Sequence, residues 1–95
     1  MKGLRFDWNA EKAAKNWRKH RVTFEEAESV WLDRRRIEIF DADHSSDDES
    51  RSVAIGFSGR MRMLIVVFTE RYEVIRLISA RCANRSETER YFAAS

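Results

Sequence analysis

The sequence contains no proline, three glycines and a single cysteine in 95 residues. Few prolines and glycines argue against flexible linkers and favour short loops between well-formed helices and strands. Cys82 cannot form an internal disulfide, and no Cys-x-x-Cys pair or Cys/His grouping has the spacing of a zinc site. We therefore expect a reduced, cytoplasmic protein that needs no metal or cofactor.

Long apolar segments are also lacking. The longest run, residues 63–68, is far shorter than the ~20 residues that cross a bilayer, and the N-terminus has no signal-like apolar stretch. Apolar residues make up 43% and charged residues 36%, the balance of a globular chain. These values predict one domain over residues 1–95 with no membrane partner.

Charge is present but unevenly distributed. The net formal charge of +2 divides into +5 over residues 1–22, −7 over residues 23–50 and +4 over residues 51–95. Basic ends around an acidic middle indicate two surfaces of opposite sign, and the basic one could meet nucleic acid. Charged faces that only keep a small domain dissolved would give the same pattern.

Hydrophobic periodicity predicts an α+β fold. Alternating or continuous apolar residues indicate strands at 4–8, 37–42, 53–57, 63–70 and 74–79, and helical spacing indicates helices at 10–20, 24–33 and from 86 onward. Residues 41–50, acidic and without periodicity, should form a loop. The order predicts a small antiparallel sheet with two N-terminal helices and a C-terminal helix packed on it.

Several local signals support the predicted helices. Ala10, Ala13, Ala14 and Trp17 form one apolar stripe, so we expect Trp17, like Trp8 and Trp31, in the core. Thr23 with Glu26, and Ser86 with Glu89, have the spacing of capping boxes.

The hairpin between the two longest strands carries unusual charges. A three-residue loop would place Glu70 and Arg76 on one face of the sheet, whereas a two-residue loop would place them on opposite faces. Arg81 has the opposite parity to Arg76 and can join it only if the strand bends. An inert cross-strand Glu–Arg pair explains the same residues. Guanidinium groups nevertheless gather around this hairpin and suit phosphate oxygens: Arg60, Arg62, Arg71, Arg76 and Arg81.

Four segments resemble the BrnT family of bacterial type II toxins. They are F-D-W-N-A-E-K-A-A-K-N-W-R-K-H, V-T-F-E-E-A, R-M-L-I-V-V-F-T-E-R and V-I-R-L-I-S-A-R-C-A-N-R-S-E-T-E-R-Y, in family order over nearly the whole chain. The resemblance implies a RelE-like fold and a ribosome-independent ribonuclease. It also implies an antitoxin with a ribbon-helix-helix DNA-binding domain, through which alone the toxin would contact DNA at its own promoter.

The resemblance implies metal-independent cleavage, in which the ribose 2′-OH attacks the neighbouring phosphorus. On this hypothesis Glu70 is the base, Arg76 and Arg81 stabilise the phosphate, and His20 is the acid, with Lys19 as its alternative. A helix C-terminus attracts histidine for structural reasons as well. The remaining candidates for RNA binding are Arg60, Arg62, Arg71 and Tyr72.

Two departures from the family pattern stand out. Arg21 lies where the family usually has glycine, and a left-handed backbone there would cost Arg21 about 1–2 kcal/mol. Asp33-Arg34 replaces an Asp-Pro pair. A non-catalytic family member that binds RNA or protein, or a purely structural partner in a complex, remains an alternative to the enzyme.

Overall fold

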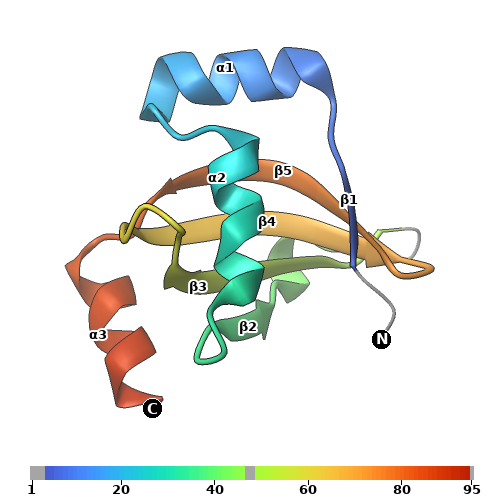
Figure 1. Cartoon of the computed structure of the whole chain (residues 1–95). Helices are drawn as coiled ribbons and strands as arrows, with labels where there is room; N and C mark the ends of the chain where they lie inside the picture. Colours follow the sequence, from blue (N-terminus) through green and yellow to red (C-terminus); the bar gives the residue numbers. More distant parts are fainter. Residues whose placement is uncertain (1–3, 47–48, 95) are drawn as a thin grey trace.

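A computed structural model describes residues 4–46 and 49–94. Its centre is a five-stranded sheet in the order β1-β5-β4-β3-β2, built from β1 (Arg5–Asp7), β2 (Ile37–Phe40), β3 (Arg51–Phe57), β4 (Met63–Arg71) and β5 (Val74–Cys82) (Figure 1). β2 to β5 are antiparallel, but β1 runs parallel to β5. The predicted antiparallel sheet is therefore a mixed sheet, because alternation identifies a strand but not its neighbour or its direction.

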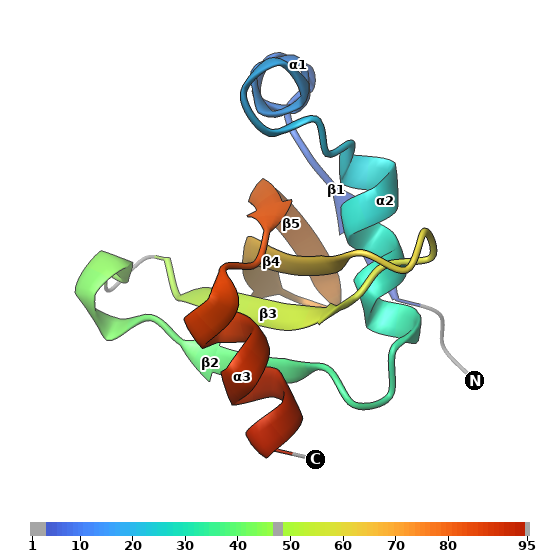
Figure 2. The ribbon, with the colours of Figure 1, turned by 90° about the vertical axis from the view of Figure 1, so that its left-hand side faces the viewer.

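Helices lie on two sides and along one edge of this sheet. α2 (Phe24–Glu28) and the 3-10 turn η1 (Ser29–Leu32) cover one face, α3 (Arg85–Ala93) lies against the other face near β3, and α1 (Ala10–His20) runs along the β5 edge (Figure 2). The core lies between the sheet and α2–η1, and its largest fully buried side chains include Phe24, Phe68, Leu64 and Ile75. We call the face that α3 only partly covers the open face. No helix among the described residues is long and apolar enough to cross a membrane.

The helix ends differ in part from the predicted ones. Thr23 caps α2 as expected, but α2 is short and continues as η1 rather than as α-helix to residue 33. α3 begins at Arg85, and its capping box lies two residues earlier than predicted, because Asn84 and Glu87 form it in place of Ser86 and Glu89. The predicted acidic loop contains a short 3-10 turn, η2 (Ala42–His44), while its residues 47 and 48 lie outside the described residues.

α1 does not bury the predicted stripe. Trp17 is 41% exposed, and Ala10 and Ala14 are exposed too, whereas the buried side chain of this helix is Asn16. Asn16 Nδ2 donates to Val22 O at 2.9 Å and Ala80 O at 2.8 Å, and Ala80 N donates to Asn16 Oδ1 at 3.0 Å. These bonds turn the Asn16 side of α1 toward β5, so the prediction of a core Trp17 is wrong. Trp31 is buried as predicted and Trp8 is half-buried against Phe24.

The backbone at Arg21 is left-handed, with φ 55° and ψ 38°. It ends α1 through a hydrogen bond from Arg21 N to Trp17 O at 2.8 Å. The left-handed backbone on which the predicted cost depended is therefore present, and Arg21 holds this conformation at the steric cost of its Cβ.

Candidate active site

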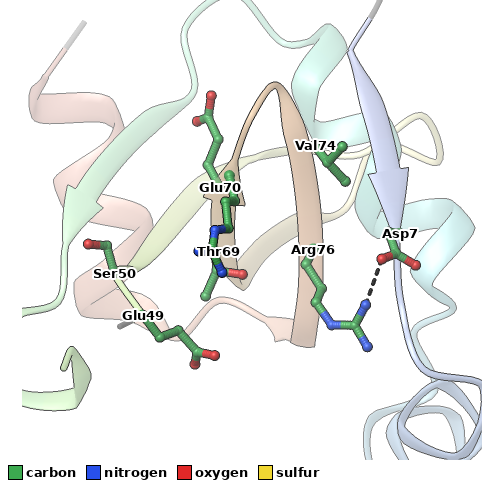
Figure 3. A pocket seen from close by; sticks show the side chains of 8 residues that line it. Asp7, Glu49, Ser50, Thr69, Glu70, Val74 and Arg76 are labelled. Atoms are coloured by element: carbon green, nitrogen blue, oxygen red, sulfur yellow. Dashed lines mark hydrogen bonds and ion pairs between the residues drawn. The ribbon is translucent and has the colours of Figure 1, made fainter. Parts of the chain in front are cut away.

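The β4–β5 hairpin turns through two residues. Tyr72 and Glu73 both have positive φ, 51° and 67°, and Arg71 pairs with Val74 across the turn. Glu70 therefore lies opposite Ile75 on the α2 face, and Arg76 lies opposite Thr69 on the open face. The carboxylate of Glu70 points away from the guanidinium of Arg76 (Figure 3). The three-residue loop that would bring these two side chains together is not formed, so their predicted convergence is wrong.

A bulge in β5 brings Arg76 and Arg81 to the same face. Val67 pairs with Ser79 and Phe68 with Leu77, which leaves Ile78 as an extra residue in β5. Beyond this bulge Arg81 pairs with Ile65, and Ile65 shares the face of Thr69, the partner of Arg76. This bulge is the bend in the strand that Arg81 needed in order to share a face with Arg76. Along β4 the backbone positions opposite these two arginines are separated by about 13 Å at ~3.3 Å per residue.

Arg76 meets a carboxylate that the sequence did not reveal. Parallel pairing places Asp7 of β1 opposite Arg76, and Arg76 Nη1 donates to Asp7 Oδ2 at 2.6 Å. The side chains of both remain about half exposed. They line a hollow of about 530 Å³ at the hairpin end of the sheet (Figure 3), together with Glu49, Ser50, Thr69, Glu70, Arg71 and Val74. The sequence carried no signal for this pair, because 69 positions separate its members.

Arg81 is paired in a similar way at the other end of β5. Its Nη1 and Nη2 donate to Oε1 and Oε2 of Glu87 on α3, at 2.8 and 2.7 Å. The bond from Arg81 lowers the pKa of Glu87, burial opposes this shift, and the Asn84 N–H adds to the lowering. Glu87 in turn raises the pKa of Arg81 above its usual value. The capping residue of α3 therefore also holds a guanidinium at the border of the open face.

Arg62 is paired with a carboxylate within the fold, although its side chain is still 32% exposed. Its Nε donates to Glu26 Oε2 at 2.9 Å and its Nη2 to Glu26 Oε1, while Ser58 Oγ donates to the same carboxylate at 2.7 Å. The bond from Arg62 lowers the pKa of Glu26 against the opposing effect of burial. Arg62 Nη2 also donates to Arg21 O at 3.0 Å, and Nη1 lies 3.9 Å from Cys82 Sγ. These contacts fix the C-terminal end of α1 beside the C-terminal end of β5.

The other predicted site residues occupy both ends of the molecule. His20, half-buried, and Lys19, exposed, end α1 and so lie near the Arg81 end of β5 rather than near Arg76. Arg60 is exposed in the β3–β4 turn. Arg71 and Tyr72 lie at the hairpin, where the guanidinium of Arg71 stacks on the ring of Tyr72, which is 86% exposed.

Within residues 4–46 and 49–94 no group of three or more His, Cys, Asp or Glu side chains could hold a metal ion.

Comparison with known proteins identifies the family. A family model described as "Ribonuclease toxin, BrnT, of type II toxin-antitoxin system" matches residues 8–87. The chain belongs to this family. As a BrnT-family ribonuclease toxin it has RNA as its substrate and an antitoxin as its partner.

A solved structure has the same fold. The crystal structure of the Brucella abortus ribonuclease toxin, BrnT, superposes with a TM-score of 0.62 at 21% sequence identity, covering 87% of this chain and 100% of that one. At this identity the likeness concerns the BrnT fold alone. No curated protein matches the chain.

Proposed function

We propose that this BrnT-family toxin is a metal-independent endoribonuclease that binds a single RNA strand across the open face. The observation that carries the proposal is the β5 bulge, which directs Arg76 and Arg81 to one face about 13 Å apart. Guanidiniums so placed can hold phosphates of different nucleotides of one strand. On that face of β4, Thr69 lies opposite Arg76, Ile65 lies opposite Arg81 and Val67 lies between them, so bases can rest there.

The scissile phosphate belongs at Arg81. His20 and Lys19 lie at that end of β5, and Glu87 is already in contact with Arg81. Arg76, held by Asp7 at the other end, anchors a neighbouring phosphate. Glu70 lies on the other side of the sheet, so the proposal transfers the role of the base from Glu70 to Glu87.

A phosphate oxygen that binds Arg81 displaces the Glu87 carboxylate. Because the Arg81 bond is the main cause of the lowered Glu87 pKa, the freed carboxylate becomes a stronger base. It takes the 2′-OH proton as the 2′-oxygen bonds to phosphorus, the bond from phosphorus to the 5′-oxygen breaks, and His20 protonates that oxygen. The products carry a 2′,3′-cyclic phosphate and a 5′-OH, and Arg81 stabilises the charge that builds on the phosphate.

Single-turnover cleavage of a 5′-labelled RNA tests these roles. Arg81→Ala and Glu87→Gln should lower the maximal rate about 100-fold or more, since losing one preorganised donor has that cost. Glutamine at position 87 keeps the α3 capping box. His20→Asn should lower the maximal rate as well. Lys19→Ala should lower it less, because Lys19 is only the alternative candidate for the acid. Arg76→Ala should weaken RNA affinity at nearly full maximal rate, and cleavage should persist in a metal chelator.

Glu70→Gln is the control carboxylate variant: Glu70 lines the hollow at the hairpin end, but its carboxylate points away from Arg76 and it lies at the other end of the hairpin from Arg81. A loss in Glu70→Gln as large as in Glu87→Gln would contradict the assignment. A wild-type chain that binds RNA but leaves it intact would identify a non-catalytic family member.

We also propose that the antitoxin carries a ribbon-helix-helix domain, that the complex represses its own promoter, and that the toxin works in the cytoplasm. These proposals rest on the motif resemblance to BrnT toxins and their RelE-like relatives. A short neighbouring reading frame with a ribbon-helix-helix pattern, whose product abolishes growth inhibition when co-expressed, is the expected finding.

A further inference from the structure

The exposed surface of α1 carries one large aromatic side chain and four cations. Trp17, 41% exposed, lies on a helix whose exposed cations are Lys12, Lys15, Arg18 and Lys19. Glu11 is the acid of this helix, and no ion pair joins these four cations to an acid in the part of the chain that the structure describes. In contrast, Arg62, Arg76 and Arg81 are all engaged by carboxylates. α1 therefore presents positive charge that the fold itself does not use.

Arg21 adds a guanidinium to this surface at a conformational cost. Its φ of 55° is strained for any residue with a Cβ. The useful backbone contacts here, from Arg21 N to Trp17 O and from Arg62 Nη2 to Arg21 O, would also form with glycine. The side chain contributes one contact in the described structure, in which its Cζ lies 5.2 Å from the centre of the Trp17 ring. Strain retained without a benefit to the fold points to a use in binding.

We propose that the Trp17–Arg21 stack, with the neighbouring Arg18, binds the part of a single-stranded RNA that extends beyond the cleavage site. Single-stranded nucleic acid is held by aromatic rings on which bases stack and by cations that follow the phosphates, and α1 supplies both. α1 runs along the β5 edge, and its C-terminal end lies beside the end of β5 that carries Arg81 (Figure 2). An RNA strand leaving the open face at Arg81 reaches this helix next. The inference rests on the proposed function for the location of the cleavage site, but not for binding itself.

Arg21→Gly separates RNA binding from folding, because the substitution should lower RNA affinity without lowering stability. Glycine fits the left-handed backbone, so the melting temperature should be no lower than that of the wild type. Affinity for RNA should fall about five- to tenfold with the loss of the stacked guanidinium. The slope of log affinity against log salt should become shallower by about 0.7, the contribution of one phosphate contact on a single strand. Trp17→Leu, which keeps an apolar side chain without a π-face, should weaken binding by a similar factor.

The probe is a 2′-O-methyl RNA oligonucleotide, which lacks the attacking hydroxyl and stays intact. Arg85→Ala is the matched control, since it removes the same charge from a side chain that is 93% exposed on α3; it should change affinity less than twofold. If Arg21→Gly and Arg85→Ala lost equal RNA affinity, the inference would be overturned, because affinity would then depend only on the net charge of the protein. If Arg21→Gly and Trp17→Leu kept the RNA affinity of the wild type but were no longer neutralised by the antitoxin, the inference would be overturned, because the stack would then bind protein. If RNA binding depended on Arg21 but the wild-type chain did not cleave unmodified RNA, the proposed function would be contradicted and the RNA-binding inference would stand.

Discussion

Asn16 is the buried polar side chain that joins α1 to β5. Its amide pairs with two carbonyl groups and one N–H, on Val22 and Ala80. Asn16→Ala leaves those groups unpaired in a site that is 5% exposed, so we expect a loss of about 3 kcal/mol in the free energy of unfolding. Asn16→Asp should lose more at neutral pH, because a carboxylate would face two carbonyl oxygens. Urea unfolding measures both changes.

Lys15→Ala is the control for this prediction, because Lys15 is exposed on the same helix and should change the free energy of unfolding by less than about 0.5 kcal/mol. Full stability of Asn16→Asp would contradict the proposed role of the amide. The rotation of α1 could not be predicted from hydrophobic spacing, which counts Trp17 as core and Asn16 as surface. Asn16 is buried where it bonds to Ala80 of β5, and hydrophobic spacing along α1 carries no information about a partner 64 positions away.

At the scale of elements, the β4–β5 turn is held in an unfavourable backbone. Two consecutive residues with positive φ suit Asn-Gly, whereas Tyr72 and Glu73 carry the steric cost of that conformation. The double change Tyr72→Asn with Glu73→Gly should raise the free energy of unfolding by about 1 kcal/mol, seen as a melting temperature about 4–8 °C higher. Tyr72→Phe, which keeps the strained backbone and the ring under Arg71, should leave the melting temperature unchanged. A lower melting temperature in the double variant would argue against the two-residue turn.

The strands were predictable from the sequence to within a few residues, but their register was not. Alternation and apolar runs locate β2 to β5 and the hairpin tip near Tyr72. A change of one residue in loop length, or one bulged residue such as Ile78, reverses which face a side chain occupies. For this reason the sequence could name Arg76 and Arg81 but not show that they share a face, and it paired Arg76 with Glu70 rather than Asp7.

At the scale of the whole molecule, ion pairs between distant segments tie the separate elements together. Glu26–Arg62 joins α2 to the start of β4, Arg81–Glu87 joins β5 to α3, and Asp7–Arg76 joins β1 to β5. The basic and acidic composition was visible in the sequence, but the pairing of individual charges depends on the fold. The charge pattern therefore indicated a basic surface that could meet nucleic acid, and it could not tell which cations remain unpaired.

Two of these pairs should make stability depend on pH. The pKa values of Glu26 and Glu87 are lowered in the folded chain, chiefly by hydrogen bonds from Arg62 and Arg81. A carboxyl group with a lowered folded pKa stabilises the fold above its unfolded value, 4.5 here, and loses that contribution as the pH falls below it. Thermal unfolding followed from pH 7 to pH 3 should show a falling melting temperature below about pH 4.5.

Glu26→Gln should remove part of this acid dependence. At pH 7 the variant should lose about 2 kcal/mol of unfolding free energy, because Arg62 then lacks its charged acceptor. As the pH falls below 4.5 the wild type progressively loses the stabilisation that its ionised carboxylate provides, so the two curves should converge. Glu25→Gln, an exposed neighbour on the same helix, should follow the wild-type curve throughout. Parallel curves for Glu26→Gln and the wild type would mean that the Glu26–Arg62 pair is not the source of the acid sensitivity.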